Sequence, residues 1–124
     1  MITSPTQLPD IQDREDITRL LEDFYKRATA DDEIGHHFIS LDLESHIPVI
    51  ANFWEKILLG NPVYFGNPFD VHKRIHERSP ITAQHFNRWV TIFRETLDSL
   101  FSGQVADLAK ERAGMIANSL SMRI

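Results

Sequence analysis

The sequence predicts an all-α domain of about four main helices joined by one long irregular connection. Apolar residues recur at three- and four-residue steps in four stretches, glycine or proline separates these stretches, and no run alternates as a strand would. A chain of 124 residues has room for one hydrophobic core. We expect residues 1–12 to form a flexible arm and residues 13–124 to form a single domain.

The first two helices have clear boundaries. Asp13 can cap the first, and its apolar face comprises Ile17, Leu20, Leu21, Phe24 and Ala28. The second covers about residues 44–59 and ends at Gly60, a residue typical of helix C-termini. Pro48 lacks an N–H and fits without loss only in a first turn, so we expect this helix to begin within about four residues before it.

Two further helices follow a long connection. Thr82 is expected to cap the third helix, which closes at Gly103. The apolar residues of the fourth are Val105, Leu108, Ala109, Met115, Ile116 and Leu120. Roughly 20 residues separate Gly60 from Thr82, whereas helices in a bundle need connections of only about 2–8 residues. Long irregular segments often carry function, and this one holds two histidines.

Composition excludes several classes of protein. The net charge of −5 and the lack of a Lys/Arg cluster disfavour nucleic acid as a partner. No stretch is long and apolar enough to span a bilayer and the N-terminus does not resemble a signal peptide, so we expect a cytoplasmic protein without a membrane partner. Without cysteine, disulfides, iron–sulfur clusters and haem attached through CxxCH are excluded, and any transition metal must be held by imidazole or carboxylate.

The connection contains a candidate metal-binding pair, His72 and His76. At a spacing of four they would share a helix face, as zinc-binding histidines do. Such a pair is more often two surface residues, and no HExxH motif is present, so a catalytic zinc site is weakly supported.

Three polar aromatic side chains accompany the apolar faces of three predicted helices: Tyr25, His46 and Trp89. Taken singly, each is typical of a core residue with one polar group. Taken together, they indicate an apolar cavity with a few convergent polar groups, as in a ligand pocket. A helical domain that brackets a planar cofactor between a histidine and a polar face has the arrangement of a globin.

The sequence resembles the group III truncated haemoglobins over about residues 17–120. The motifs that carry the resemblance occur in order: DFY (23–25), IGHHF (34–38), HIPVIANFWEKILLG (46–60), VYFGNP (63–68), HERSPITAQHFNRW (76–89) and IFRETLDSLF (92–101). The resemblance implies a truncated-globin fold, a two-over-two helical sandwich around haem b. In that fold the proximal helix is largely loop, which explains the long connection.

The resemblance also implies roles for single residues. The iron ligand is expected at His76, thirteen residues before Trp89 and four before Pro80, in preference to His72, which lies four residues too early. The other ring N–H of this histidine should find a carbonyl or a carboxylate. Tyr25, His46 and Trp89 are expected to face the bound ligand. The residues expected to contact the haem are Phe38, Ile50, Phe53 and Phe93.

A haem protein of this group is expected to bind O₂, CO and NO. Donors from Tyr25 and Trp89 would slow O₂ release, which suits NO oxidation or peroxide turnover, with an unidentified reductase, better than oxygen delivery. Whether the protein is an enzyme stays open. The alternative is a non-haem helical protein in which His72 and His76 bind zinc or are structural.

Overall fold

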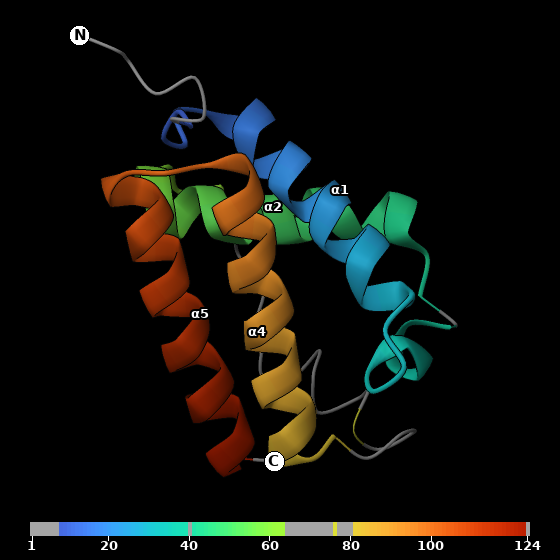
Figure 1. The fold of residues 1–124 in the computed structure, drawn as a ribbon. Helices are drawn as coiled ribbons and strands as arrows, with labels where there is room; N and C mark the ends of the chain where they lie inside the picture. The colour runs from blue at the N-terminus through green and yellow to red at the C-terminus, as the bar shows by residue number, and fades with distance from the viewer. Residues whose placement is uncertain (1–7, 40, 64–75, 77–80, 124) are drawn as a thin grey trace, which may run out of the picture.

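The computed structural model describes residues 8–39, 41–63, 76 and 81–123. Its elements are α1 (Arg14–Thr29), the 3₁₀ turn η1 (Gly35–Phe38), α2 (Leu43–Leu59), α4 (Ala83–Leu100) and α5 (Gln104–Arg123), as Figure 1 shows. No strand occurs among these residues, so the prediction of an all-α domain is confirmed for the described part. None of the described helices has the length and apolar character needed to cross a membrane.

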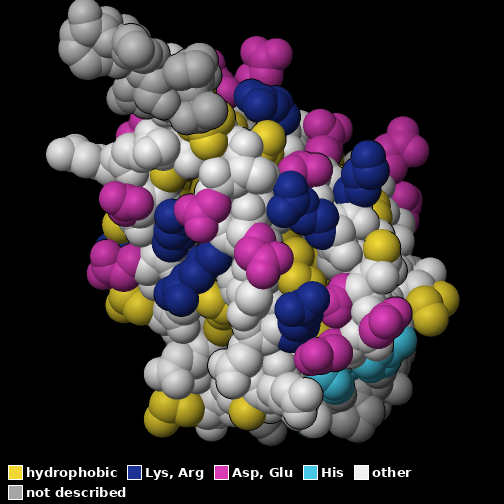
Figure 2. Space-filling view, viewed as in Figure 1, with side chains coloured by type: hydrophobic (Ala, Val, Ile, Leu, Met, Phe, Trp, Pro, Cys, Tyr) yellow, Lys and Arg dark blue, Asp and Glu magenta, His cyan; other side chains and the backbone are white. Residues whose placement is uncertain are grey.

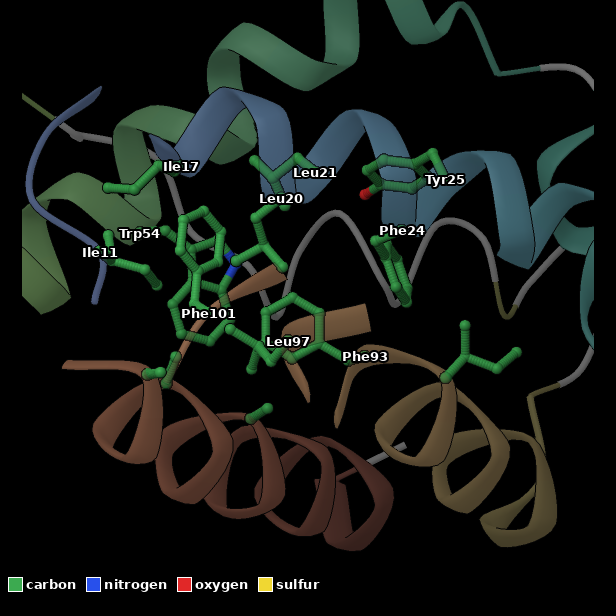
Figure 3. Close-up of a cluster of buried hydrophobic side chains, with 14 of the residues drawn as sticks. Ile11, Ile17, Leu20, Leu21, Phe24, Tyr25, Trp54, Phe93, Leu97 and Phe101 are labelled. Atoms are coloured by element: carbon green, nitrogen blue, oxygen red, sulfur yellow. The ribbon is translucent and has the colours of Figure 1, made fainter. Parts of the chain in front are cut away.

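The helices form two packed pairs. α1 packs against α2, and α4 packs against α5, to which a short connection joins it (Figure 1). α1 also packs on α4, so the two pairs share one core. Figure 3 shows large side chains from these helices meeting at the centre, with Phe24, Phe93 and Phe101 among the most deeply buried.

Three helix ends lie where the sequence places them. The Asp13 side chain accepts a hydrogen bond from the Asp16 N–H at the start of α1. Gly60 closes α2 with a φ of 75°, a left-handed conformation that glycine adopts without strain. Thr82 caps α4 by accepting from the His85 N–H at 3.2 Å. These three predictions are confirmed. Such helix ends can be predicted from the sequence because a cap acts on backbone groups only a few residues away.

The prediction for Pro48 is wrong by a small margin. α2 begins at Leu43, five residues before Pro48, so the proline lies beyond the first turn. The helix contains Pro48 as an interior residue, and the position cannot donate a helical N–H bond. The Pro48 carbonyl accepts a hydrogen bond from Arg14 at 3.1 Å, which ties the start of α1 to this turn of α2.

Part of the expected N-terminal arm packs against the domain. Ile11 is buried, and the Asp10 carboxylate accepts the N–H groups of Val105 and Ala106 at 2.9 Å each. These two donors belong to the first turn of α5, so a residue far away in sequence caps that helix. Gly103 permits this approach, since a Cβ there would lie 2.5 Å from the Asp10 carboxyl carbon. The packed region therefore begins before Asp13.

α5 packs through small residues rather than through its largest apolar ones. Its buried residues follow steps of three and four: Ala106, Ala109, Ala113, Ala117 and Leu120. Met115, which we placed on the apolar face, is 54% exposed. Alanine at the contact lets two helix backbones approach closely, so this helix brings Ile116 and Leu120 to the cavity described below.

Candidate functional site

The turn η1 is held tightly against the end of α1. A Cβ on Gly35 would lie 2.7 Å from the Thr29 carbonyl oxygen, so no other residue fits without displacing the turn. The Gly35 N–H donates to the Asp31 carbonyl at 2.9 Å. This packing places the Phe38 ring edge-on to the Tyr25 ring, with centroids 5.7 Å apart.

A cavity of about 100 Å³ lies among the four helices and η1. It has room for several water molecules or a diatomic ligand. Most of its wall is apolar, and its described lining residues are Tyr25, Ile34, His37, Phe38, Leu41, His46, Ile50, Phe53, Trp54, Ile81, His85, Phe86, Trp89, Ile116, Ala117 and Leu120. An apolar wall with a few polar groups is typical of a small-molecule site.

Tyr25 and His46 form a polar pair in this wall. The Tyr25 hydroxyl lies 2.9 Å from Nε2 of His46, and the two rings meet edge to face. Only 6% of Tyr25 is exposed, and this burial raises the pKa of its hydroxyl well above the ordinary value. The phenol therefore keeps its proton at physiological pH and can donate it either to His46 or to a ligand in the cavity.

Trp89 is held by a stack of aromatic rings, of which Trp54 and Trp89 themselves line the cavity. It lies parallel to Phe93, with centroids 5.5 Å apart and 11° between planes, and Phe93 stacks in turn on Trp54. Phe24 meets both Trp89 and Phe93 edge-on. Three other rings, on three helices, thus fix the position of Trp89.

The structure brings together most of the residues expected at the site. The cavity wall includes the three polar residues Tyr25, His46 and Trp89, and the apolar residues Phe38, Ile50 and Phe53. Phe93 does not line the cavity: its exposed fraction is 0%, and it supports Trp89 from behind. Sequence periodicity could not separate these two positions, because they lie one helical turn apart on the same face of α4.

His76 is partly buried and lies next to the cavity rather than in its described wall. Its Nδ1 accepts the Ile81 N–H at 2.9 Å, and Ile81 does line the cavity. We expected the ring nitrogen of His76 that does not bind metal to donate a hydrogen bond, yet Nδ1 accepts one. The proton of a neutral His76 ring is then on Nε2, so metal binding through Nε2 requires the proton to move to Nδ1. His72 lies outside the described residues.

Sequence reasoning missed His37 and His85, which also line the cavity. His37 Nε2 lies 3.1 Å from His85 Nδ1, and the two residues are 48 positions apart. Burial, and then the neighbouring rings of His36, His85 and His76, lower the pKa of His37 to about 4. The only signals in the sequence were the His-His pair at 36–37 and a histidine three residues after a helix cap.

The chain is similar to known proteins over nearly its whole length. The family model described as bacterial-like globin matches residues 10–122. The group 3 truncated hemoglobin ctb of Campylobacter jejuni subsp. jejuni serotype O:2 is 29% identical over 111 residues, which are 85% of each chain. A crystal structure of group III truncated hemoglobin from Campylobacter jejuni has a TM-score of 0.82 and 27% identity, and the match covers 94% of both chains.

Proposed function

Because the chain belongs to the bacterial-like globin family, which implies a bound haem, we propose that His76 ligates the haem iron and that Tyr25, His46 and Trp89 face the bound gas. The sequence match and the structural match confirm the resemblance to group III truncated haemoglobins and the truncated-globin fold. Membership of the family leaves open the ligating residue, the ligands and the reaction.

The residues around the cavity fit such a group. A porphyrin ring is flat and apolar, and aromatic residues of the cavity wall such as Phe38, Phe53 and Phe86 would hold it. Imidazole is an established ligand of haem iron, and in this cysteine-free chain His76 stands beside the cavity. When bound, haem supplies an iron atom with a free coordination position for a diatomic ligand.

The observation that carries the proposal is the hydrogen bond between Tyr25 and His46 in an otherwise apolar wall. A buried hydroxyl that keeps its proton is a donor ready for a polarised ligand such as O₂. The indole N–H of Trp89 can only donate. By analogy with oxyanion holes, each hydrogen-bond donor that points at a developing negative charge in a site without water stabilises that charge by about 2–4 kcal/mol.

Donors of this strength favour slow O₂ release over delivery. We therefore propose that the protein uses bound O₂, NO or peroxide in redox chemistry, such as NO oxidation or peroxide turnover, with electrons from a reductase in the cytoplasm. CO would bind at the same position as an inert ligand. His46 lies beside Tyr25 and can accept a hydrogen bond from its hydroxyl until a ligand binds.

Haem titration of the purified protein tests the proposal. We expect an intense Soret band at one haem per chain and a shift of that band when CO is added to the reduced protein. Absence of the band after haem addition would overturn the proposal in favour of a non-haem helical protein. Stopped-flow measurement of O₂ dissociation then separates slow release from delivery.

A further inference from the structure

Three histidine side chains meet at the rim of the cavity. His36 and His37 belong to η1, His85 belongs to the first turn of α4, and one ring nitrogen from each lies within 4.8 Å of the others. Their ring centroids are 4.1 Å apart for the pair in η1, 4.9 Å for His37 and His85, and 5.5 Å for His36 and His85. Figure 2 shows histidine side chains together at the molecular surface (cyan, lower right).

The hydrogen bonds of this cluster leave one nitrogen unsatisfied. His85 Nδ1 accepts the Thr82 N–H at 3.2 Å, so it acts as an acceptor toward His37 Nε2 as well. His37 Nε2 is then the donor, and the lone pair of His37 is on Nδ1. Nδ1 of His37 is buried and has no hydrogen-bond partner in the described structure. A buried acceptor without a partner is costly.

The two segments that carry the cluster are tied together beside it. The Asp31 carboxylate, just before η1, accepts from Arg88 Nε at 2.8 and 3.2 Å, and Arg88 lies one turn after His85 in α4. Burial raises the pKa of Asp31, but the bonds from Arg88 and from backbone N–H groups outweigh it, so the carboxylate stays charged. With Gly35 packed on α1, this ion pair holds the three rings in place before any ligand binds.

We propose that His36, His37 and His85 bind one divalent transition-metal ion at the cavity rim, separate from the haem iron. Three imidazoles without a carboxylate in the group suit Zn²⁺, Cu²⁺ or Ni²⁺ and not Ca²⁺ or Mg²⁺. With Zn–N bonds of about 2.0–2.1 Å, tetrahedral ligands lie about 3.3 Å apart. His37 Nε2 and His85 Nδ1 lie 3.1 Å apart, and an ion bound by both atoms would replace the hydrogen bond between them, with the His37 proton moving from Nε2 to Nδ1. Rotation of the exposed His36 ring would bring its nitrogen to the ion as the third ligand, and a water molecule would be the fourth.

Zinc binding by the haem-loaded protein tests this inference. The protein is freed of adventitious metal with a chelator and dialysed against Zn²⁺, and iron and zinc are counted in the same sample. We expect one zinc per haem. His36→Gln should lower the zinc affinity by at least about tenfold, the loss that removal of an outer-shell partner already causes. It should leave the haem content unchanged, since His36 does not line the cavity.

His72→Gln is the matched control, because it makes the same substitution at another histidine of the chain. It should bind zinc as the unaltered protein does. The inference rests on the proposed function only in assigning His76 to iron. Because zinc and iron are counted separately, failure of the rim site can be distinguished from failure of the proposed function. Zinc bound equally by His36→Gln, zinc lost in His72→Gln, or zinc bound only after haem removal would each overturn the rim site. Absence of iron alone would overturn the proposed function.

Discussion

The Tyr25 hydroxyl and His46 Nε2 lie 2.9 Å apart, which joins α1 to α2 through the wall of an apolar cavity. The hydroxyl has one proton, so it can serve either His46 or a ligand at any moment. When His46 Nε2 accepts the tyrosine proton, ligand binding and the α1–α2 hydrogen bond compete for the same donor. Two substitutions test this competition, one that removes the donor and one that removes the acceptor His46.

Tyr25→Phe keeps the ring and removes the donor. We expect O₂ dissociation to accelerate by at least about tenfold, since the loss of about 1.4 kcal/mol corresponds to that factor. Stopped-flow displacement of O₂ by CO measures the rate. Thermal unfolding of the same variant controls for damage to the core, because the Tyr25 ring packs on Phe24 and Phe38. An unchanged dissociation rate would show that another group holds the ligand.

His46→Leu should act in the opposite direction. Without the imidazole, the Tyr25 hydroxyl loses its competing acceptor and is available to the ligand throughout. We expect slower O₂ dissociation than in the unaltered protein, measured in the same stopped-flow experiment. Acceleration as large as that of Tyr25→Phe would mean that His46 itself donates to the ligand and that the competition does not operate.

Trp89→Phe separates the indole N–H from the bulk of the ring. Phenylalanine can keep the stack on Phe93, so the loss of stability should fall within the ordinary range of about 0.5–3 kcal/mol. If the N–H polarises the ligand, the infrared stretch of bound CO shifts and O₂ dissociates faster. A variant that is less stable but has an unchanged CO stretch would leave Trp89 as a packing residue.

Asp10→Asn tests the long-range cap of α5. Burial raises the pKa of Asp10, but hydrogen bonds from the N–H groups of Val105, Ala106, Ile11 and Gln104 outweigh it and hold the pKa below its usual range. A lowered folded-state pKa stabilises the protein at neutral pH, and this contribution disappears as the pH falls through that pKa. Asparagine turns one of the two carboxylate acceptors into a donor, so we expect the variant to lose about 0.5–1.5 kcal/mol at pH 7.

The stability difference between Asp10→Asn and the unaltered protein should therefore shrink in acid. Urea unfolding at a series of pH values measures it, and Asp32→Asn, at an exposed aspartate away from the cap, is the control. A difference that stays constant into the acid range would show that the charge of Asp10 does not contribute.

The sequence alone was sufficient for helix ends that depend on local chemistry. Asp13, Gly60 and Thr82 each act on backbone groups within a few residues, and the structure has all three in those roles. Cavity positions such as Tyr25 and His46 were reached through resemblance to a family, because nothing local reveals that residues 21 positions apart touch.

Features that depend on long-range contacts and on side-chain packing could not be predicted from the sequence. The meeting of His37 and His85 depends on how η1 folds over α1, which in turn depends on the close approach at Gly35. Met115 fits the apolar period of α5, yet the contact with α4 selects alanines, since close helix packing favours small side chains over large ones. Asp10 was assigned to an arm because its partners begin 95 residues later.

Haem titration of His76→Ala and His72→Ala tests most directly whether His76 ligates the haem iron. We predict that His72→Ala binds haem with the Soret band and reduced spectrum of the unaltered protein. His76→Ala should lose the spectrum of histidine-ligated iron, and added imidazole should restore it by filling the vacated position. Loss of that spectrum in His72→Ala, with His76→Ala unaffected, would contradict the assignment.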